Sequence, residues 1–172
     1  IVESSHASSS LSWADGISRA FKATGNKDRH VVAVIGDGAL TGGMAWEALN
    51  NITDDNDRNL VIVVNDNGRS YAPTIGGLAK TLNAIRTEPW YKKSYSLSKR
   101  IFYKMGTLGK VVFDSVHAAG QRVLVSNTAT GIFPNLDIKY IGPIDGHNLQ
   151  DMETALRQAK DYGAPVIVHA IT

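Results

Sequence analysis

The sequence predicts an α/β domain of three layers, a parallel β-sheet with helices on both faces, and two observations support that fold class. Short apolar runs rich in valine and isoleucine alternate with longer segments of helical periodicity. The runs are apolar at nearly every position rather than at every second one, which is typical of strands covered on both faces. The 172 residues, 43% hydrophobic and 20% charged, are enough for one domain with a core.

Four strands are expected, three of them strongly. The strong runs are bounded by Gly, Asn or Asp, which are residues that end strands and open turns. They cover 31–35, 60–64 and 165–171, and a weaker run covers 138–141.

Helices are expected over 11–24, 41–52 and 149–162, where apolar residues recur every three or four positions. Asn148 is placed to cap the last of these helices, with Asp151 at its third position. The residues expected to face the core are, helix by helix, Leu11, Trp13, Ala14, Ile17, Ser18 and Phe21; Met44, Trp46, Ala48, Leu49 and Ile52; and Leu149, Met152, Leu156 and Ala159.

Residues 68–137 are less regular and are interpreted as an inserted or peripheral segment with a further helix near 94–108. Within it, 86–110 carries seven basic residues and one acidic residue, interleaved with aromatic ones. This pattern fits either a nucleic-acid patch or a solvated helix with one apolar side. The net charge of this segment is +6 and that of the whole chain is +2, so the rest of the chain carries −4. The solvated helix is favoured for this reason.

Composition excludes several classes of protein. The absence of cysteine rules out disulfides, thiolate metal sites and cysteine nucleophiles, and it fits a cytoplasmic location. The net charge of +2 is too small for a surface dominated by nucleic-acid binding. No apolar run approaches the ~18 residues of a membrane span. We therefore expect neither a nucleic acid nor a membrane as a partner.

The two ends of the chain predict a fragment of a larger protein. The chain begins at Ile1 rather than at methionine, and the motif-like residues Ser4, Ser5 and His6 follow at once. No charged or apolar leader precedes them, so no signal peptide is expected. The chain stops inside the apparent strand over 165–171.

The triplet Gly36-Asp37-Gly38 follows the first strand, and a helix is expected to begin just after it. In a parallel sheet, ligands bind at the carboxyl ends of the strands, where the next helix opens. The free N–H groups at a helix start favour phosphate, and a glycine lets the backbone approach the ligand closely. The Asp37 carboxylate would repel a phosphate, and a Mg²⁺ ion between the two, which prefers oxygen ligands, resolves that conflict.

The second strand runs into Asn65-Asp66-Asn67-Gly68-Arg69, which would lie beside the first motif if the two strands are neighbours. An Asn side-chain oxygen would then be a second metal ligand and a turn carbonyl a third. Either motif alone is a common turn, whereas both at strand ends, separated by one crossover helix, form a much stronger signal. A dinucleotide fold and a P-loop are disfavoured, because the sequence has neither glycine pattern.

Longer stretches around these motifs resemble one family. Residues 36–51, 64–78, 3–8 and 140–147 resemble the corresponding parts of 1-deoxy-D-xylulose-5-phosphate synthases, thiamine-diphosphate enzymes of the transketolase-like superfamily. The four stretches keep the order seen in that family, and residues 86–127 are the least distinctive. The resemblance implies a thiamine-diphosphate-binding fold, incomplete in this chain.

The resemblance also implies roles for individual residues. Asp37 and Asn67 match the side-chain ligands of Mg²⁺, and Arg69 matches the position whose backbone carbonyl completes the protein ligands. Gly38, Ala39 and Asn67 match contacts to the diphosphate.

A loop near the start of the chain is implied to lie over the cofactor. Ser5, His6 and Ala7 match that loop, with His6 near the reacting carbon, where an imidazole that titrates near neutral pH is suited to move protons. Taken without the resemblance, a histidine after two serines is more often a helix-start residue.

The implied reaction is the condensation of pyruvate with D-glyceraldehyde 3-phosphate to 1-deoxy-D-xylulose 5-phosphate, an isoprenoid and thiamine precursor, with release of carbon dioxide. Family members are homodimers, and a glutamate from a second, pyrimidine-binding domain activates the cofactor. Residues 1–172 are therefore expected to be part of the diphosphate-binding domain. The pyrimidine-binding and C-terminal domains are absent, and the isolated piece is predicted to be inactive.

Two other functions compete with this one. A transketolase-like ketol transferase is disfavoured by the run over 67–74, and a non-catalytic interaction module is disfavoured by intact Asp37 and Asn67. His147 is expected to serve a turn and cap rather than a metal, and Glu47 and Glu153 are expected to be solvated.

Overall fold

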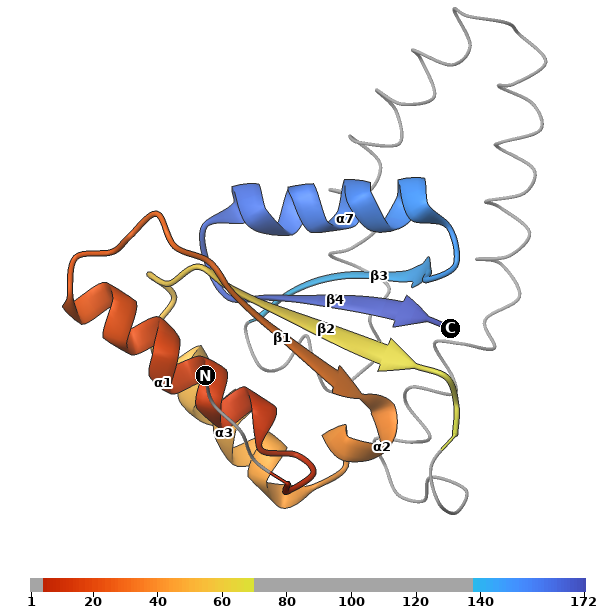
Figure 1. The fold of residues 1–172 in the computed structure, drawn as a ribbon, viewed down its shortest axis with the longest axis horizontal. Coiled ribbons are helices and arrows are strands. Elements are labelled where there is room, and N and C mark those ends of the chain that lie inside the picture. Colours follow the sequence, from red (N-terminus) through yellow and green to blue (C-terminus); the bar gives the residue numbers. More distant parts are fainter. Residues whose placement is uncertain (1–4, 70–137) are drawn as a thin grey trace, which may run out of the picture.

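The structure, a computed structural model, describes residues 5–69 and 138–172. In this part of the chain, four parallel strands form one sheet in the order β1-β2-β4-β3. The carboxyl ends of the strands therefore meet at one edge, at the right of Figure 1. The strands are β1 (Val31–Gly36), β2 (Leu60–Asp66), β3 (Lys139–Asp145) and β4 (Val166–Ile171).

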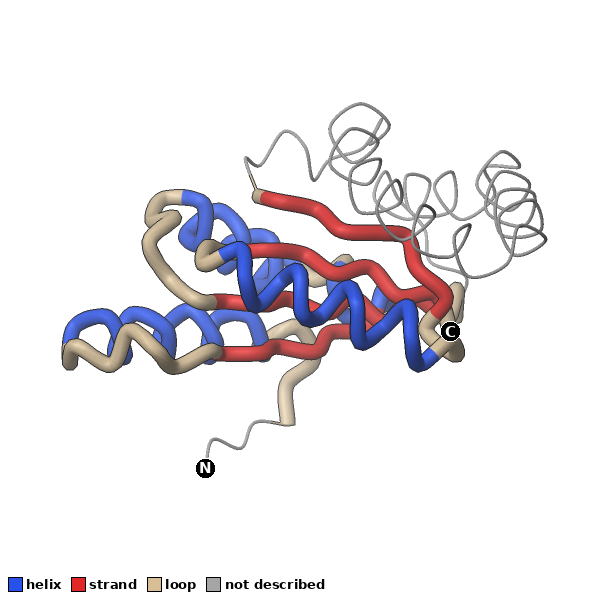
Figure 2. Tube along the Cα trace, turned by 90° about the horizontal axis from the view of Figure 1, so that it is seen from above, coloured by secondary structure: helices blue, strands red, loops and turns tan. Residues whose placement is uncertain are grey.

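Helices cover both faces of the sheet, which confirms the predicted three-layer α/β class. Helices α1 (Ser10–Ala23) and α3 (Gly43–Thr53) pack on one face, and α7 (Leu149–Tyr162) lies over the other (Figures 1 and 2). β2 and β4 are central and almost continuously buried, as their apolar runs predicted. β1 alternates between buried and exposed residues, because the described elements cover only one of its faces.

Two details of the crossover after β1 differ from prediction. A separate one-turn helix, α2 (Asp37–Leu40), opens at Asp37 itself, and α3 follows after Gly42. Met44 was expected in the core and is 47% exposed, whereas Ala45 is fully buried. The buried stripe of α3 begins at Ala45 and repeats every three or four residues, so Met44 falls on its border.

The prediction for α7 was right in its bounds and partly wrong in its buried face. Ala155 and Ala159 are buried, while Leu149 is 75% exposed and Leu156 36%. A pair of small residues one turn apart lets the helix approach the valine-rich sheet face closely. Trp13 on α1 was also expected in the core and is 48% exposed, while Trp46 packs, partly buried, against the core.

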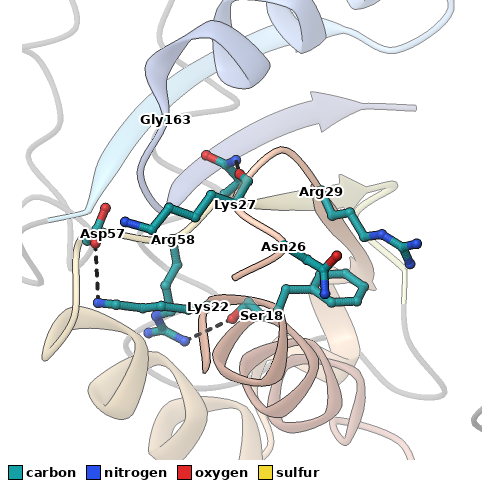
Figure 3. A pocket seen from close by; sticks show the side chains of 10 residues that line it. Ser18, Lys22, Asn26, Lys27, Arg29, Asp57, Arg58 and Gly163 are labelled. Atoms are coloured by element: carbon teal, nitrogen blue, oxygen red, sulfur yellow. Dashed lines mark hydrogen bonds and ion pairs between the residues drawn. The ribbon is translucent and has the colours of Figure 1, made fainter. Parts of the chain in front are cut away.

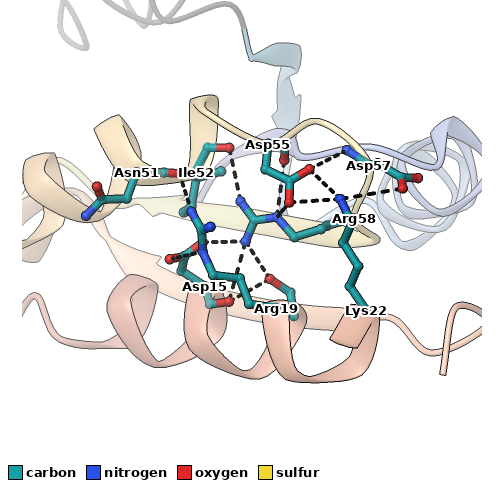
Figure 4. A network of polar contacts seen from close by, with 9 residues as sticks. Asp15, Arg19, Lys22, Asn51, Ile52, Asp55, Asp57 and Arg58 are labelled. Carbon is teal, nitrogen blue, oxygen red and sulfur yellow. Dashed lines mark hydrogen bonds and ion pairs between the residues drawn. The ribbon is translucent and has the colours of Figure 1, made fainter. Parts of the chain in front are cut away.

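A buried arginine ties α1 to the loop between α3 and β2, at the amino ends of the strands (Figure 4). The Arg58 side chain is fully buried and forms an ion pair with the Asp15 carboxylate. It also donates hydrogen bonds to Ser18 Oγ at 2.9 Å and to the Ile52 carbonyl at 3.2 Å. Nearby, Lys22 pairs with Asp55 at 2.8 Å. We call these residues the Arg58 network.

Several expectations concern parts of the chain that the structure leaves undescribed. The predicted helix near 94–108 and the basic segment over 86–110 lie outside the described residues. Among the helices that are described, none is both long enough and apolar enough to cross a membrane.

Candidate metal and diphosphate site

The two motifs singled out in the sequence lie side by side at the carboxyl edge of the sheet. β1 and β2 are hydrogen-bonded neighbours, and Gly36 at the end of β1 is the register partner of Asn65 in β2. Asp37 begins α2 directly after β1, and Asn67 follows directly after β2. The predicted adjacency of the two strand ends is confirmed.

Asp37 carries a buried carboxyl group in a negative environment. Asp37 is only 5% exposed. Burial raises its pKa above the usual range, and the neighbouring charge of Asp66 raises it further. Hydrogen bonds from the backbone of Gly38, Asp37 and Asn67 act against that rise in pKa. A cation at this point would favour the ionised carboxylate and so act against the rise in pKa.

Asn67 and Arg69 lie on a tight turn that is held by hydrogen bonds between residues 66 and 69. The backbone N–H of Gly68 donates to Asp66 Oδ1 at 3.0 Å, and that of Arg69 donates to Asn67 Oδ1 at 2.9 Å. Gly68 has a φ of +63°, a left-handed conformation that favours glycine. An amide oxygen has two lone pairs, so Asn67 Oδ1 keeps one for a ligand.

Ser5, His6 and Ala7 are exposed, and the residue that follows them, Ser8, lies against α2 and the turn between α2 and α3. Ser8 Oγ donates to the carbonyl of Ala39, a residue predicted to contact the diphosphate. A side chain at Gly42 would meet Ser8, since a Cβ there would lie 2.1 Å from Ser8 Oγ. The structure thus brings the predicted loop against the predicted phosphate turn.

A buried chain of polar residues beside this site was missed by the sequence analysis. His169 in β4, fully buried, contacts Asp66 on one side and Tyr140 on the other. The signal was present, because a histidine inside a continuously apolar strand needs hydrogen-bond partners. Its partners lie on two other strands, and the sequence alone does not show that these strands flank β4.

The turn-and-cap expectation for the Asp145–Asn148 region is confirmed. The backbone N–H of His147 donates to Asp145 Oδ1 at 2.9 Å. Asn148 caps α7 by accepting from the N–H groups of Gln150 and Asp151, and its own amide donates to Asp151 Oδ2 at 2.7 Å. This capping satisfies the start of the helix and leaves His147 exposed.

A pocket at the opposite edge of the sheet has a different character (Figure 3). Its lining includes Lys22, Lys27, Arg29 and Arg58, and none of the predicted site residues lines it. Lys22 and Arg58 are already paired with carboxylates in the Arg58 network. The pocket therefore shares two of these four basic residues with the Arg58 network.

Within residues 5–69 and 138–172, no group of three or more His, Cys, Asp or Glu side chains could hold a metal ion. The predicted ligand set is of another kind, because it combines one carboxylate, one amide and one backbone carbonyl. These are the hard oxygen donors that Mg²⁺ prefers.

Comparison with known proteins identifies the family. A family model described as 1-deoxy-D-xylulose-5-phosphate synthase matches residues 1–172. The chain belongs to this family.

Several synthases resemble the chain closely. Proteins named 1-deoxy-D-xylulose-5-phosphate synthase are 65% identical in Clavibacter sepedonicus, 64% in Leifsonia xyli subsp. xyli and 56% in Kocuria rhizophila, each over 100% of this chain. The chain spans 27% of the length of each of these curated relatives.

Proposed function

We propose that the full-length protein containing this chain is a transferase that makes 1-deoxy-D-xylulose 5-phosphate from pyruvate and D-glyceraldehyde 3-phosphate, using thiamine diphosphate and Mg²⁺. One observation carries the proposal. Asp37 and the turn that holds Asn67 are brought together at the ends of adjacent strands, in a chain of the synthase family. Residues 1–172 supply part of the diphosphate-binding domain.

The donor set fits a magnesium ion. Asp37 and Asn67 would be its side-chain ligands and the Arg69 carbonyl its third protein ligand, with diphosphate oxygens and water completing the shell. The environment of Asp37 supports this assignment. Burial and, after it, the charge of Asp66 raise the pKa of Asp37, and a divalent cation would favour its ionised form.

The cofactor would lie between this edge and the N-terminal loop. The backbone of Gly38 and Ala39, together with Asn67, would hold the diphosphate. When bound, thiamine diphosphate supplies the nucleophilic carbon and the electron sink that decarboxylation requires. Ser5 and Ala7 would help to exclude water over that carbon, and the His6 imidazole would hold or move a proton there.

The rest of the catalytic machinery is expected outside this chain. Glu47 and Glu153 are both exposed, so neither is placed as the activating glutamate of the family. We infer that the isolated chain is inactive and that the full-length protein is a cytoplasmic homodimer that binds neither nucleic acid nor membrane.

The test is product formation by the full-length protein. We expect carbon dioxide and 1-deoxy-D-xylulose 5-phosphate only when pyruvate, D-glyceraldehyde 3-phosphate, thiamine diphosphate and Mg²⁺ are all present. Transfer from a ketose phosphate without carbon dioxide would instead indicate a transketolase-like enzyme, and failure to bind the cofactor would indicate an interaction module. Product formed by the isolated 172 residues would contradict the inferred inactivity.

A further inference from the structure

Three buried polar side chains connect the interior of the sheet to the Asn67–Arg69 turn. Tyr140 Oη lies 2.6 Å from His169 Nδ1, and His169 Nε2 lies 3.0 Å from Asp66 Oδ2. The residues are 6%, 0% and 2% exposed, in that order. We call Tyr140, His169 and Asp66 the brace.

The chemical groups of the three brace residues determine which atom donates and which accepts in each hydrogen bond. A carboxylate oxygen only accepts, so His169 Nε2 carries the hydrogen that it shares with Asp66. In a neutral imidazole, Nδ1 then accepts from the Tyr140 hydroxyl. Each ring nitrogen therefore has one role and one partner, which fixes the orientation of the His169 ring.

The backbone of His169 packs closely against β3. The pairing of β3 with β4 shifts between Ile141 and Ile144, on either side of the point opposite His169. Gly142, within that shift, has a φ of +138°, and a Cβ there would lie 2.7 Å from the His169 carbonyl oxygen. Only glycine allows this close approach, so the position of His169 depends on β3 as well as on its own strand.

The brace ends on the turn that carries two of the predicted metal ligands. Asp66 uses its second carboxylate oxygen, Oδ1, to accept the Gly68 N–H at 3.0 Å. Gly68 is the central residue between Asn67 and Arg69, and it makes this bond in a left-handed conformation. Asp66 thus couples the buried imidazole to the turn.

We propose that the brace is a positioning device that holds the Asn67–Arg69 turn in place and thereby sets the affinity of the edge for Mg²⁺. Outer-shell hydrogen bonds of this kind orient first-shell ligands and determine metal affinity. The inference rests on the proposed function, because it assigns Asn67 and Arg69 to the metal. It adds that Tyr140 and His169, which do not touch the ion, determine how well it binds.

The experiment compares two substitutions at one buried position in the full-length protein. His169→Leu removes both hydrogen bonds, whereas His169→Gln places an amide N–H near the position of Nε2 and can still donate to Asp66. Two quantities are measured: Mg²⁺ affinity by calorimetry in the presence of thiamine diphosphate, and hydrogen exchange of the Gly68 amide in metal-free protein. The exchange measurement does not depend on activity.

We expect His169→Leu to weaken Mg²⁺ binding about tenfold and to speed exchange at Gly68, and His169→Gln to restore most of both. If His169→Leu does not fold, Tyr140→Phe takes its place, because it removes only one oxygen from the brace and should leave the protein folded. It should weaken Mg²⁺ binding a few-fold by releasing the ring. Ser18→Ala is the matched control, because it removes a buried hydrogen-bond partner at the opposite edge of the sheet.

The possible results separate the two proposals. Unchanged Mg²⁺ affinity and unchanged Gly68 exchange in a folded Tyr140→Phe protein would overturn the brace, as would equal changes in Ser18→Ala. If the wild-type protein binds thiamine diphosphate without Mg²⁺, the proposed metal site is overturned. The proposed effect of the brace on Mg²⁺ affinity is then overturned as well. Faster Gly68 exchange in the variants would in that case still support the structural role of the brace.

Discussion

Buried charged side chains have opposite surroundings at the amino and the carboxyl edges of the sheet. At the amino edge, the buried Arg58 is surrounded by carboxylates and carbonyls that pair with it. At the carboxyl edge, the buried Asp37 faces a second carboxylate, Asp66, and its pKa is raised. Among the described residues, the buried charge at the amino edge is paired with opposite charge, whereas at the carboxyl edge two carboxylates act on one another.

We interpret this difference as a division between residues that stabilise the fold and residues that we propose to bind a ligand. A buried ion pair whose partners are all present fixes the elements that supply them. A buried carboxylate with a raised pKa lowers stability and is retained where it has another use. On this basis we assign the Arg58 network to the stability of the fold and propose that the carboxyl edge binds the ligand.

The largest effect is expected at the amino edge. Arg58→Ala removes a fully buried guanidinium and takes a hydrogen-bond partner from Asp15, Ser18 and the Ile52 carbonyl, and it should lower the free energy of unfolding by about 3–5 kcal/mol. Urea denaturation of the full-length protein, followed by tryptophan fluorescence, measures this change, since Trp13 and Trp46 lie on the helices beside the network. Arg157→Ala is the control, because Arg157 is 74% exposed in its pair with Glu153 and should matter little. Equal losses would contradict the assignment.

Asp37→Asn should separate stability from metal binding. The folded pKa of Asp37 lies above its unfolded value, so its ionised form destabilises the fold, increasingly as pH rises through the folded pKa. Without Mg²⁺ at neutral pH, the variant should therefore melt at a higher temperature than the wild type. Its Mg²⁺ affinity should fall more than about 100-fold, beyond the effect of an outer-shell change. A variant less stable without Mg²⁺ would show that Asp37 has a structural role.

Asn148→Ala tests whether every polar residue at the carboxyl edge belongs to the site. Loss of the cap should cost about 1 kcal/mol of stability, because two N–H groups of α7 lose their acceptor. Mg²⁺ affinity should not change. Asn148→Ser, which keeps a capping oxygen, should recover most of the loss. A clear drop in Mg²⁺ affinity would extend the site to the β3 end.

The smallest effect is expected from the partly exposed pair of Lys22 and Asp55. The Lys22 ammonium lowers the pKa of Asp55, so the pair stabilises the fold above the unfolded carboxyl pKa and this contribution is lost as pH falls through the lower folded value. Asp55→Asn should be slightly less stable than the wild type at pH 7. The gap should close in acid and shrink in high salt. A gap that persists in acid would mean that Asp55 acts through uncharged contacts.

Much of the fold could be predicted because burial leaves a direct trace in the sequence. β2 and β4 were predictable from unbroken apolar runs, and the adjacent motifs at Asp37 and Asn67 followed from strand ends in a parallel sheet. The buried face of α7 was harder to predict, because Leu149 and Leu156 form an apolar stripe beside the alanines that pack on the sheet. Periodicity alone does not say which stripe faces inward.

The brace could not be predicted for a different reason. Tyr140, His169 and Asp66 come from three strands that are distant in sequence, and they meet only because β4 lies between β2 and β3. Their pairing depends on strand order and on the shift in register at Gly142. Sequence indicates that His169 needs a partner, and topology decides which one.

The most direct test of the account is a calorimetric titration of thiamine diphosphate into the full-length protein, with Mg²⁺ and again with a chelator. We predict binding with Mg²⁺, loss of that binding with the chelator, and loss in Asp37→Asn even when Mg²⁺ is present. Equal affinity in all three conditions would contradict the claim that the carboxyl ends of β1 and β2 form a metal-dependent diphosphate site.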